Sequence, residues 1–321
     1  MPLPMDGHPD GASRRIVRSD ARCISFSCFD TDNSLTLFDC AHERADVLLG
    51  QARALCRRLH ALWSFSRPAS DVARLNAPVR RVEVAPETAR LLSRMRRFNA
   101  EEPLFDFTVG RASFLWKRAD RVPDDMAVRE ACRHIGAGKL HVHGTCVSKD
   151  DPLLQVDVGA AAKGQAADLV AAQVRAAGVA CADLDFGSSL WLLGSHPEGR
   201  PWLLEVAVPP EGGFPRVQFE AQDCAVSTSS SFERSRLIAG RSFHHIVDPR
   251  NGYPVRSDIV SATVLAPSAA YADMLSTAVV VAGTEGLASL SERHGQARII
   301  AVTCDGGVVC SKNAQAVVYS Q

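Results

Sequence analysis

The chain has 321 residues, of which 46% are hydrophobic and 22% charged, a composition typical of a globular protein with a buried core. Its 36 basic residues balance 36 acidic residues, so no overall charge favours nucleic acid or an anionic membrane surface as a partner. We therefore expect any anionic ligand to be held by local groups.

The first 20 residues are polar, contain proline and glycine, and are expected to be disordered. They lack the apolar core of a signal peptide, and no later stretch combines the length and apolarity of a membrane span. The ten cysteines are scattered, without a CxxC pair or a zinc-ligand spacing, which favours reduced thiols. From these features we expect a cytoplasmic protein in which residues 21–321 form one domain, with or without a division into two lobes.

The spacing of apolar residues predicts the elements of the N-terminal half. Residues 23–38 are typical of a strand pair around a polar turn, and residues 41–62 of a long helix. A short capped helix is expected over 70–76, and a second long helix over 86–99. Residues 140–158 alternate like strands, and an alanine-rich helix over 163–177 is expected to stop at Gly178.

The C-terminal half is predicted to consist mainly of strands. They are expected over residues 181–186, 191–193, 202–208, 224–227, 242–247, 259–265, 297–304 and 308–318, with a helix over 269–282. Strand runs with helices inserted at irregular intervals predict an α+β fold, with mixed or antiparallel sheets and helices packed on them.

Residues 244–254 place two imidazoles and a carboxylate, those of His244, His245 and Asp248, in a segment stiffened by two prolines and a glycine. Histidine accepts or donates a proton near neutral pH, so a rigid loop that carries it is typical of a catalytic site. The alternative is a strand that ends in a turn, with one histidine buried and the other solvated.

Residues 157–164 place small residues between a strand and a helix, with Lys163 near the start of the helix. Free amides at a helix start and an ammonium together favour a phosphate site. The spacing matches neither a P-loop nor GxGxxG, and a small-residue helix packed closely on a sheet is the alternative.

Asp273 and Thr277 are four residues apart, which puts a carboxylate and a hydroxyl on one face of a helix. Such oxygens suit magnesium when substrate phosphates complete its shell; the alternative is a solvated aspartate and a threonine bonded to its own backbone.

Five consecutive hydroxyl residues, 227–231, follow a predicted strand. They suit phosphate oxygens, although a serine-rich surface loop has the same composition.

Six motifs resemble, in the same order, those of the ApbE family, the FAD:protein FMN transferases. They lie at residues 65–76, 105–116, 157–164, 226–229, 244–254 and 267–277. The resemblance implies an ApbE-like fold and an enzyme that uses FAD as a substrate together with Mg²⁺. It implies cleavage of the FAD pyrophosphate, attachment of the FMN half to a threonine or serine hydroxyl of an acceptor flavoprotein, and release of AMP.

The resemblance also implies roles for individual residues. Asp273, Thr277 and the backbone carbonyl of Ala162 would be metal ligands. His245 is the first candidate for the catalytic imidazole and His244 the second, while Asp248 would orient it or take part in proton removal. The residues expected near the dinucleotide are Thr108, Gly159, Lys163, Asp185, Gly187, Ser227, Thr228, Ser229 and Asn251.

Residues 185–189 depart from the pattern N-x-GGD of the family, because the asparagine is replaced by Asp185 and the second glycine by Ser188. A side chain in place of a glycine and a new carboxylate near phosphates are expected to weaken FAD binding or change its pose. Two alternatives stay open: an FAD pyrophosphatase that gives FMN and AMP, and a divergent FAD-binding homologue without catalysis.

Overall fold

The computed structural model describes residues 21–233, 235–238 and 240–319. The segment predicted to be disordered, residues 1–20, lies outside the described residues. The centre of the fold is an eight-stranded sheet in which every neighbouring pair is antiparallel. Its strands, in spatial order, are β1 (Arg22–Cys28), β2 (Thr31–Phe38), β6 (Cys181–Asp185), β7 (Ser189–Leu193), β10 (Cys224–Ser230), β13 (Ile259–Ala266), β14 (Arg298–Thr303) and β15 (Val308–Cys310).

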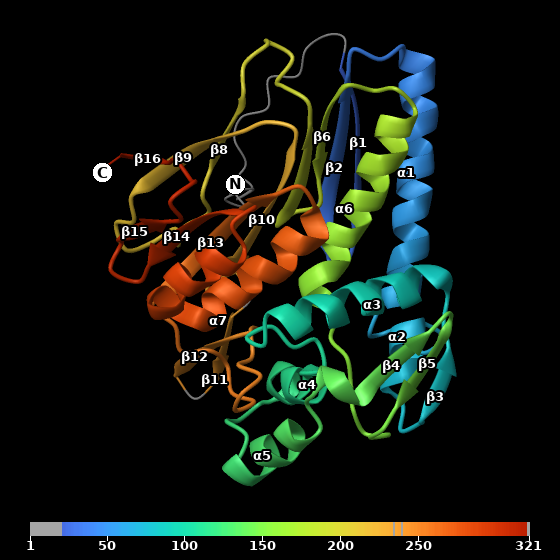
Figure 1. Ribbon diagram of the computed structural model, residues 1–321, viewed down its shortest axis with the longest axis vertical. Helices are drawn as coiled ribbons and strands as arrows, with labels where there is room; N and C mark the ends of the chain where they lie inside the picture. The colour runs from blue at the N-terminus through green and yellow to red at the C-terminus, as the bar shows by residue number, and fades with distance from the viewer. Residues whose placement is uncertain (1–20, 234, 239, 320–321) are drawn as a thin grey trace, which may run out of the picture.

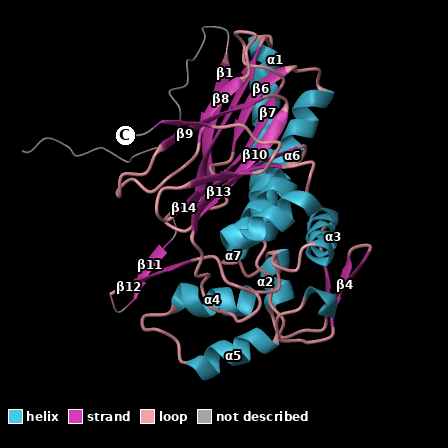
Figure 2. Ribbon diagram, turned by 60° about the vertical axis from the view of Figure 1, so that its left-hand side comes forward, coloured by secondary structure: helices cyan, strands magenta, loops and turns pink. Residues whose placement is uncertain are grey.

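Three long helices cover one face of this sheet (Figures 1 and 2): α1 (His42–Trp63), α6 (Gly159–Ala176) and α7 (Ala269–Arg293). The core between them and the sheet is built mainly from leucine, valine and alanine side chains. A second core lies on the other face, under a three-stranded sheet of β8 (Trp202–Glu205), β9 (Arg216–Ala221) and β16 (Val317–Tyr319). The main sheet is therefore buried on both faces.

Helix α7 is apolar around much of its circumference, as expected for a helix packed between α6 and the sheet. The expectation that no stretch has the length and apolarity of a membrane span was wrong for α7, which among the described residues is the one helix that has both. Half of that stretch is buried inside the protein. Its regular geometry breaks at Gly283, which has φ 67°. The backbone amide and the hydroxyl of Thr284 both donate to the Asp258 carboxylate, so a new helix start follows the break.

The remaining elements form a smaller layer beside the ends of α1, α6 and α7 (Figure 1). Four helices belong to it: α2 (Asp71–Asn76), α3 (Pro86–Glu101), α4 (Gly110–Arg118) and α5 (Asp125–Arg133). It also contains the 3₁₀ turn η1 (Ala137–Lys139), a small sheet of β3 (Arg81–Glu83), β5 (Cys146–Lys149) and β4 (Leu140–His143), and the hairpin β11 (Ser235–Ile238) and β12 (Arg241–His244).

The α+β prediction is confirmed, and the sheets are antiparallel. Several local predictions were wrong. The strands predicted over 202–208 and 242–247 end at Glu205 and His244, the one over 308–318 is interrupted between Cys310 and Val317, and α7 continues to Arg293. Residues 150–158 are a connection and not a strand, because their backbone groups bond to side chains and loops of the smaller layer. Helix α6 begins at Gly159, four residues before the predicted start, and β10 continues to Ser230 because its hydroxyl-rich half pairs with β13. Helices α4 and α5 were not predicted.

Candidate functional site

The carboxylate of Asp273 joins three elements that are distant in sequence. Asp273 lies in the second turn of α7 and is only 3% exposed. Its Oδ1 accepts the hydroxyl of Ser227 from β10 at 3.0 Å, and its Oδ2 accepts the backbone amide of Gly164 from α6 at 3.2 Å. A buried carboxylate needs such partners, since an unpaired one would carry a large desolvation cost.

Gly164 permits this convergence because α6 and α7 cross very closely. A Cβ atom added to Gly164 would lie 2.4 Å from the carbonyl oxygen of Ala269 and 2.6 Å from the amide nitrogen of Ala270, both of them rigid backbone atoms. Any larger residue would push the helices apart. The small residues of 157–164 therefore do pack closely, as one reading of the sequence predicted, and the packing itself brings the Gly164 amide to Asp273.

Hydroxyl groups of β10 extend the cluster along α7. The Thr277 hydroxyl donates to the backbone carbonyl of Asp273 at 3.1 Å and lies 3.2 Å from the hydroxyl of Ser229. Because side chains alternate along a strand, Ser227 and Ser229 both face α7. Thr228 faces the opposite side, where its hydroxyl pairs with that of Thr263 at 2.9 Å. All three residues were expected near the dinucleotide, but the structure places Thr228 on the opposite side of the strand from Ser227 and Ser229.

The turn between β6 and β7 closes one side of this cluster. The carbonyl of Ser188 accepts the Ser227 hydroxyl and the Thr228 amide. Asp185 accepts the Gly187 amide at 2.7 Å, so at least one of its oxygens shapes its own turn. Gly187 has φ 76°, and an added Cβ would lie 2.6 Å from the hydroxyl oxygen of Thr31. Glycine is required here both by the backbone conformation and by the contact with the β1–β2 turn.

A cavity of about 370 Å³ opens at the start of α6. Its walls come from the β1–β2 turn, the end of α1, α4 and the first turn of α6. The aromatic side chains on it are Phe29, Trp63, Phe65 and Phe114, and the cationic ones include Lys117, Arg118 and Lys163. The rings of Phe65 and Phe114 stack with centroids 3.6 Å apart, and the Arg118 guanidinium lies 5.3 Å from the Phe65 ring. Aromatic walls with cations suit a ligand that has planar rings and phosphates.

Two acidic residues, Asp30 and Asp157, line the cavity, and Asp157 is firmly held. Its Oδ1 accepts the Gly159 amide at 2.9 Å, and its Oδ2 accepts the Ser113 hydroxyl and the Lys117 ammonium, each at 2.8 Å. Burial alone would raise the pKa of Asp157, but the Lys117 charge and these hydrogen bonds hold that pKa well below its usual value. Asp157 is therefore ionised throughout the neutral range. The sequence analysis missed Ser113 and Lys117, although their spacing of four residues on a helix would have signalled a shared face.

The start of α6 links the cavity to the Asp273 cluster. Gly159, Ala162 and Lys163 line the cavity, while Gly164, one residue further, touches Asp273. Lys163 makes one long hydrogen bond, 3.5 Å, to the Gly159 carbonyl. The described residues contain no group of three or more His, Cys, Asp or Glu side chains suited to a metal. The oxygens around Asp273 come from one carboxylate and from hydroxyl groups. Such a group of oxygens fits a hard cation only when water and a phosphate supply the remaining ligands.

Residues 244–254 form a rigid loop on α4 and α5. The indole of Trp116 donates to the Gly252 carbonyl at 2.9 Å and stacks on Phe243 with ring centroids 5.1 Å apart. His244 Nε2 lies 2.6 Å from the Val255 carbonyl and donates to it. Burial lowers the pKa of His244 below its usual value, so this imidazole is neutral at pH 7. A rigid imidazole loop was predicted, and its stiffness comes from α4 as well as from its prolines.

Three predicted site residues have other partners in the structure. Asp248 bonds to the Arg250 guanidinium, with contacts of 2.7–3.1 Å, and accepts the side-chain amide of Asn251 at 3.4 Å. Asn251 also accepts the Tyr253 amide, which builds the same turn. Thr108 is fully buried, its hydroxyl donates to Asp106, and it accepts the Gly136 amide, so it ties the segment before α4 to the segment before η1. Thr108 therefore has no free surface for a ligand.

The described residues that line the cavity do not include any from the 244–254 loop. Helix α4 contacts both features. Ser113 and Lys117 of α4 bond to Asp157 at the cavity, whereas Trp116 of the same helix contacts the histidine loop. The structure therefore brings together α6, Asp273, Thr277, Ser227 and Ser229. The loop over 244–254 is held against α4 through Trp116.

Comparison with known proteins gives one consistent result. The ApbE family model matches residues 29–301. The FAD:protein FMN transferase of Rhodobacter capsulatus is 33% identical over 270 residues, which are 81% of this chain and 51% of that protein, so the match spans about half the length of that relative. The FAD:protein FMN transferase of Haemophilus influenzae is 25% identical over 279 residues, 82% of this chain and 81% of that protein.

Solved structures are similar over nearly the whole chain. The flavin transferase ApbE of Vibrio cholerae has a TM-score of 0.80 at 25% identity, covering 92% of this chain and 97% of that one. The ApbE protein of Thermotoga maritima has a TM-score of 0.81 at 25% identity, covering 91% and 97%. Both likenesses include the main sheet with its helices and the smaller layer.

Proposed function

The chain belongs to the ApbE family, and from this premise we propose that it is an FAD:protein FMN transferase, which moves the FMN part of FAD to an acceptor protein. In full, the proposal is a Mg²⁺-dependent reaction in which a threonine or serine hydroxyl of an acceptor flavoprotein attacks the FMN phosphate and AMP is released. The family membership and the names of the relatives support the transfer itself.

The observation that carries the proposal is the convergence of α6, α7 and β10 on the Asp273 carboxylate. Asp273, Thr277 and the carbonyl of Ala162 would hold the metal, and oxygen donors of this kind are the ones that Mg²⁺ prefers. Helix α6 carries Gly164 at the Asp273 cluster and Lys163 at the cavity. A diphosphate bound at the start of α6 would therefore lie beside the proposed Mg²⁺.

The cavity supports FAD as the ligand. Its stacked Phe65 and Phe114 rings offer an apolar surface to a planar heterocycle, and Lys163 and Arg118 offer charge to phosphates. The ionised Asp157 is neutralised by Lys117 and so does not repel an anionic ligand with a full charge. These features agree with a bound dinucleotide whose diphosphate lies near the helix start.

The proposed step is a substitution at phosphorus. The acceptor oxygen forms a bond to the FMN phosphorus, the phosphoanhydride bond to AMP breaks, and AMP leaves with that electron pair. A bound Mg²⁺ supplies charge neutralisation on the phosphoryl oxygens. The hydroxyl proton passes to a base, which we assign to His245, since the Nε2 of His244 is committed to the Val255 carbonyl.

Measurement of AMP tests this proposal. The full chain is incubated with FAD and MgCl₂, with and without the soluble domain of a flavoprotein acceptor, and AMP is quantified by chromatography. Transfer predicts AMP release that depends on both the acceptor and the metal. Release at the full rate without acceptor would identify a pyrophosphatase, and tight FAD binding without any AMP would identify a non-catalytic FAD-binding protein.

We also propose a cytoplasmic location. All ten cysteines are free thiols, a state that fits a reducing compartment. Fractionation of cells that express the native chain tests this proposal, with recovery from a membrane or an oxidising compartment as the contrary result.

A further inference from the structure

Lys149, the last residue of β5, is a buried lysine that the proposed reaction does not use. It is 3% exposed, and its ammonium donates to four backbone carbonyls: those of Leu75 at 2.7 Å, Ala77 at 3.1 Å, Pro152 at 3.0 Å and Leu154 at 2.9 Å. Burial lowers the pKa of Lys149 to about 8, so the ammonium form, with three N–H donors, prevails at pH 7. The side chain therefore ties two separate stretches of backbone together.

The two stretches are the end of α2 and the connection that follows β5. Asn76 lies between two of the bonded carbonyls, and its side chain pairs with the backbone of Val156 in both directions. The Asn76 Nδ2 donates to the Val156 carbonyl at 2.9 Å, and the Val156 amide donates to Asn76 Oδ1 at 2.7 Å. Gln155 adds a bond from its side chain to the Asn76 carbonyl at 3.2 Å. The position of Val156 thus depends on the position of α2, which Lys149 fixes.

Val156 leads directly into the wall of the cavity. The next three residues, Asp157, Val158 and Gly159, all line it, and Gly159 is the first residue of α6. We infer that Lys149 is a positioning residue for this wall: its ammonium sets the end of α2 and the 152–154 connection, and Asn76 passes that placement to Asp157 and the start of α6. The inference rests on the proposed function only for the identity of the ligand as FAD.

A purely structural role explains the choice of lysine less well. A buried ammonium carries a desolvation cost, and apolar side chains of similar volume often replace buried charges without loss of stability. A methionine has a similar length and would fill the same space. Methionine has no N–H donors, so it could not hold the four carbonyl oxygens together. The position of the cavity wall depends on that arrangement of carbonyls.

The test uses Lys149→Met in the full chain. The dissociation constant of FAD is measured by quenching of flavin fluorescence, and kcat and KM for FAD are measured with acceptor present. A displaced wall predicts that the dissociation constant and KM rise about 10-fold while kcat changes less than about 3-fold. Lys149→Gln, whose amide keeps two N–H donors, is expected to give an intermediate value. A merely structural role predicts a lower Tm and a smaller active fraction with KM unchanged, and that result would overturn the inference.

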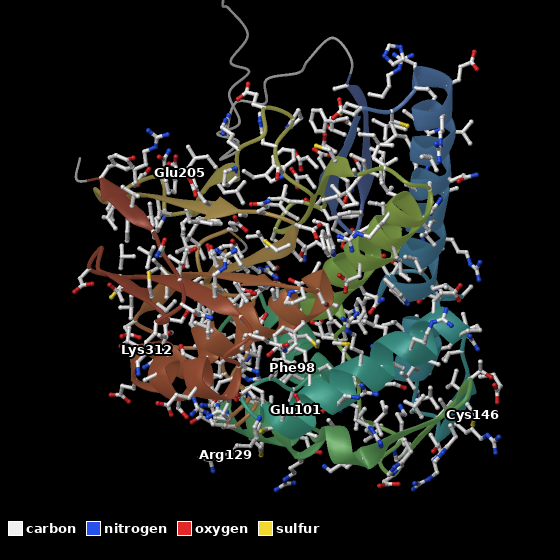
Figure 3. The ribbon with its side chains drawn as sticks, turned by 45° about the horizontal axis from the view of Figure 1, so that its top comes forward. Phe98, Glu101, Arg129, Cys146, Glu205 and Lys312 are labelled. Atoms are coloured by element: carbon white, nitrogen blue, oxygen red, sulfur yellow. The ribbon has the colours of Figure 1, made fainter. Side chains whose placement is uncertain are left out.

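The matched control is Lys312→Met, because Lys312 is exposed and lies at the opposite side of the molecule from Cys146, which begins β5 (Figure 3). It is expected to bind FAD like the wild type. If the wild type binds FAD but transfers nothing, the proposed function fails and the binding test of Lys149 still stands. If neither Lys149 variant folds, amide hydrogen exchange of the wild type tests the inference instead. Protection of Leu154 and Val156 equal to that of helix α6 is expected, and exchange at the rate of a surface loop would contradict the inference.

Discussion

The backbone amide of Gly164 donates to the carboxylate of Asp273 across 3.2 Å, and this bond joins the start of α6 to the second turn of α7. The two residues are 109 positions apart in the chain. Their contact places a buried acid beside the cavity that Gly159, Ala162 and Lys163 line. The arrangement depends on two features, the close crossing of α6 and α7 and the charge of Asp273. Different substitutions test each of them.

Gly164→Ala tests the close crossing. Its methyl group would meet the Ala269 carbonyl at 2.4 Å, so we expect a loss of about 1–3 kcal/mol in the free energy of unfolding and a loss of transfer activity. Urea denaturation measures the first quantity. Gly50→Ala in α1 is the matched control, since nothing lies within 4 Å of the added methyl. It is expected to be neutral or to stabilise by up to about 1 kcal/mol. Equal effects of the two substitutions would contradict the crossing argument.

Asp273→Asn tests the charge. The amide keeps the size of the side chain but loses the anionic ligand, so we expect AMP release to fall at least about 100-fold and the response to MgCl₂ to disappear. Thermal unfolding is expected to show a folded protein. Asp46→Asn is the control, because Asp46 is exposed and forms an ion pair with Arg22 at the surface. Magnesium dependence that persists in Asp273→Asn would remove this residue from the metal site.

Lys117→Met tests the ion pair at the cavity through its pH dependence. The folded pKa of Asp157 lies below its unfolded value, so the pair contributes stability above pH about 3.8 and loses it as the pH falls toward the folded pKa. We therefore expect the wild type to exceed Lys117→Met in free energy of unfolding at pH 7, with the difference shrinking at pH 3. Urea denaturation at several pH values measures it. A difference independent of pH would show that Lys117 acts through packing alone.

His244 and His245 are expected to respond differently to substitution. Burial holds the folded pKa of His244 below its unfolded value, so the unfolded chain takes up a proton first, and stability falls as the pH drops below about 6.5. His244→Gln should flatten that part of the stability profile between pH 7.5 and 5. His245→Gln should reduce kcat, as expected for a base. A loss of kcat confined to His244→Gln would reverse the assignment.

The sequence predicted local features well and the pairing of distant segments poorly. The four-residue spacing of Asp273 and Thr277 was sufficient to place them on one helix face, because helix geometry is local. The partner of Asp273 on α6 was not predictable in this way. The Gly164 amide reaches Asp273 only because α6 and α7 pack closely at Ala269. Thr228 was grouped with Ser227 and Ser229 because all three belong to one motif of the family resemblance. Pairing of β10 with β7 and β13 makes them a strand and turns Thr228 to the other face.

The cavity illustrates the same limit. Asp157 was noticed in its motif, but its partners Ser113 and Lys117 are more than 35 residues away, on a helix that was not predicted. Thr108 was expected at the ligand because of the motif that contains it, but its side chain is buried and bonds to Asp106 and Gly136. A motif therefore identifies a site, but which of its residues face the ligand depends on packing.

Intact mass spectrometry of an acceptor flavoprotein tests the central claim most directly. The acceptor is incubated with FAD, MgCl₂ and either the wild-type chain or Asp273→Asn, and its mass is measured after denaturation. The account predicts that the wild type adds one FMN through a bond that survives denaturation, and that Asp273→Asn adds none. An acceptor mass that stays unchanged with the wild type, or that rises equally with Asp273→Asn, would contradict it.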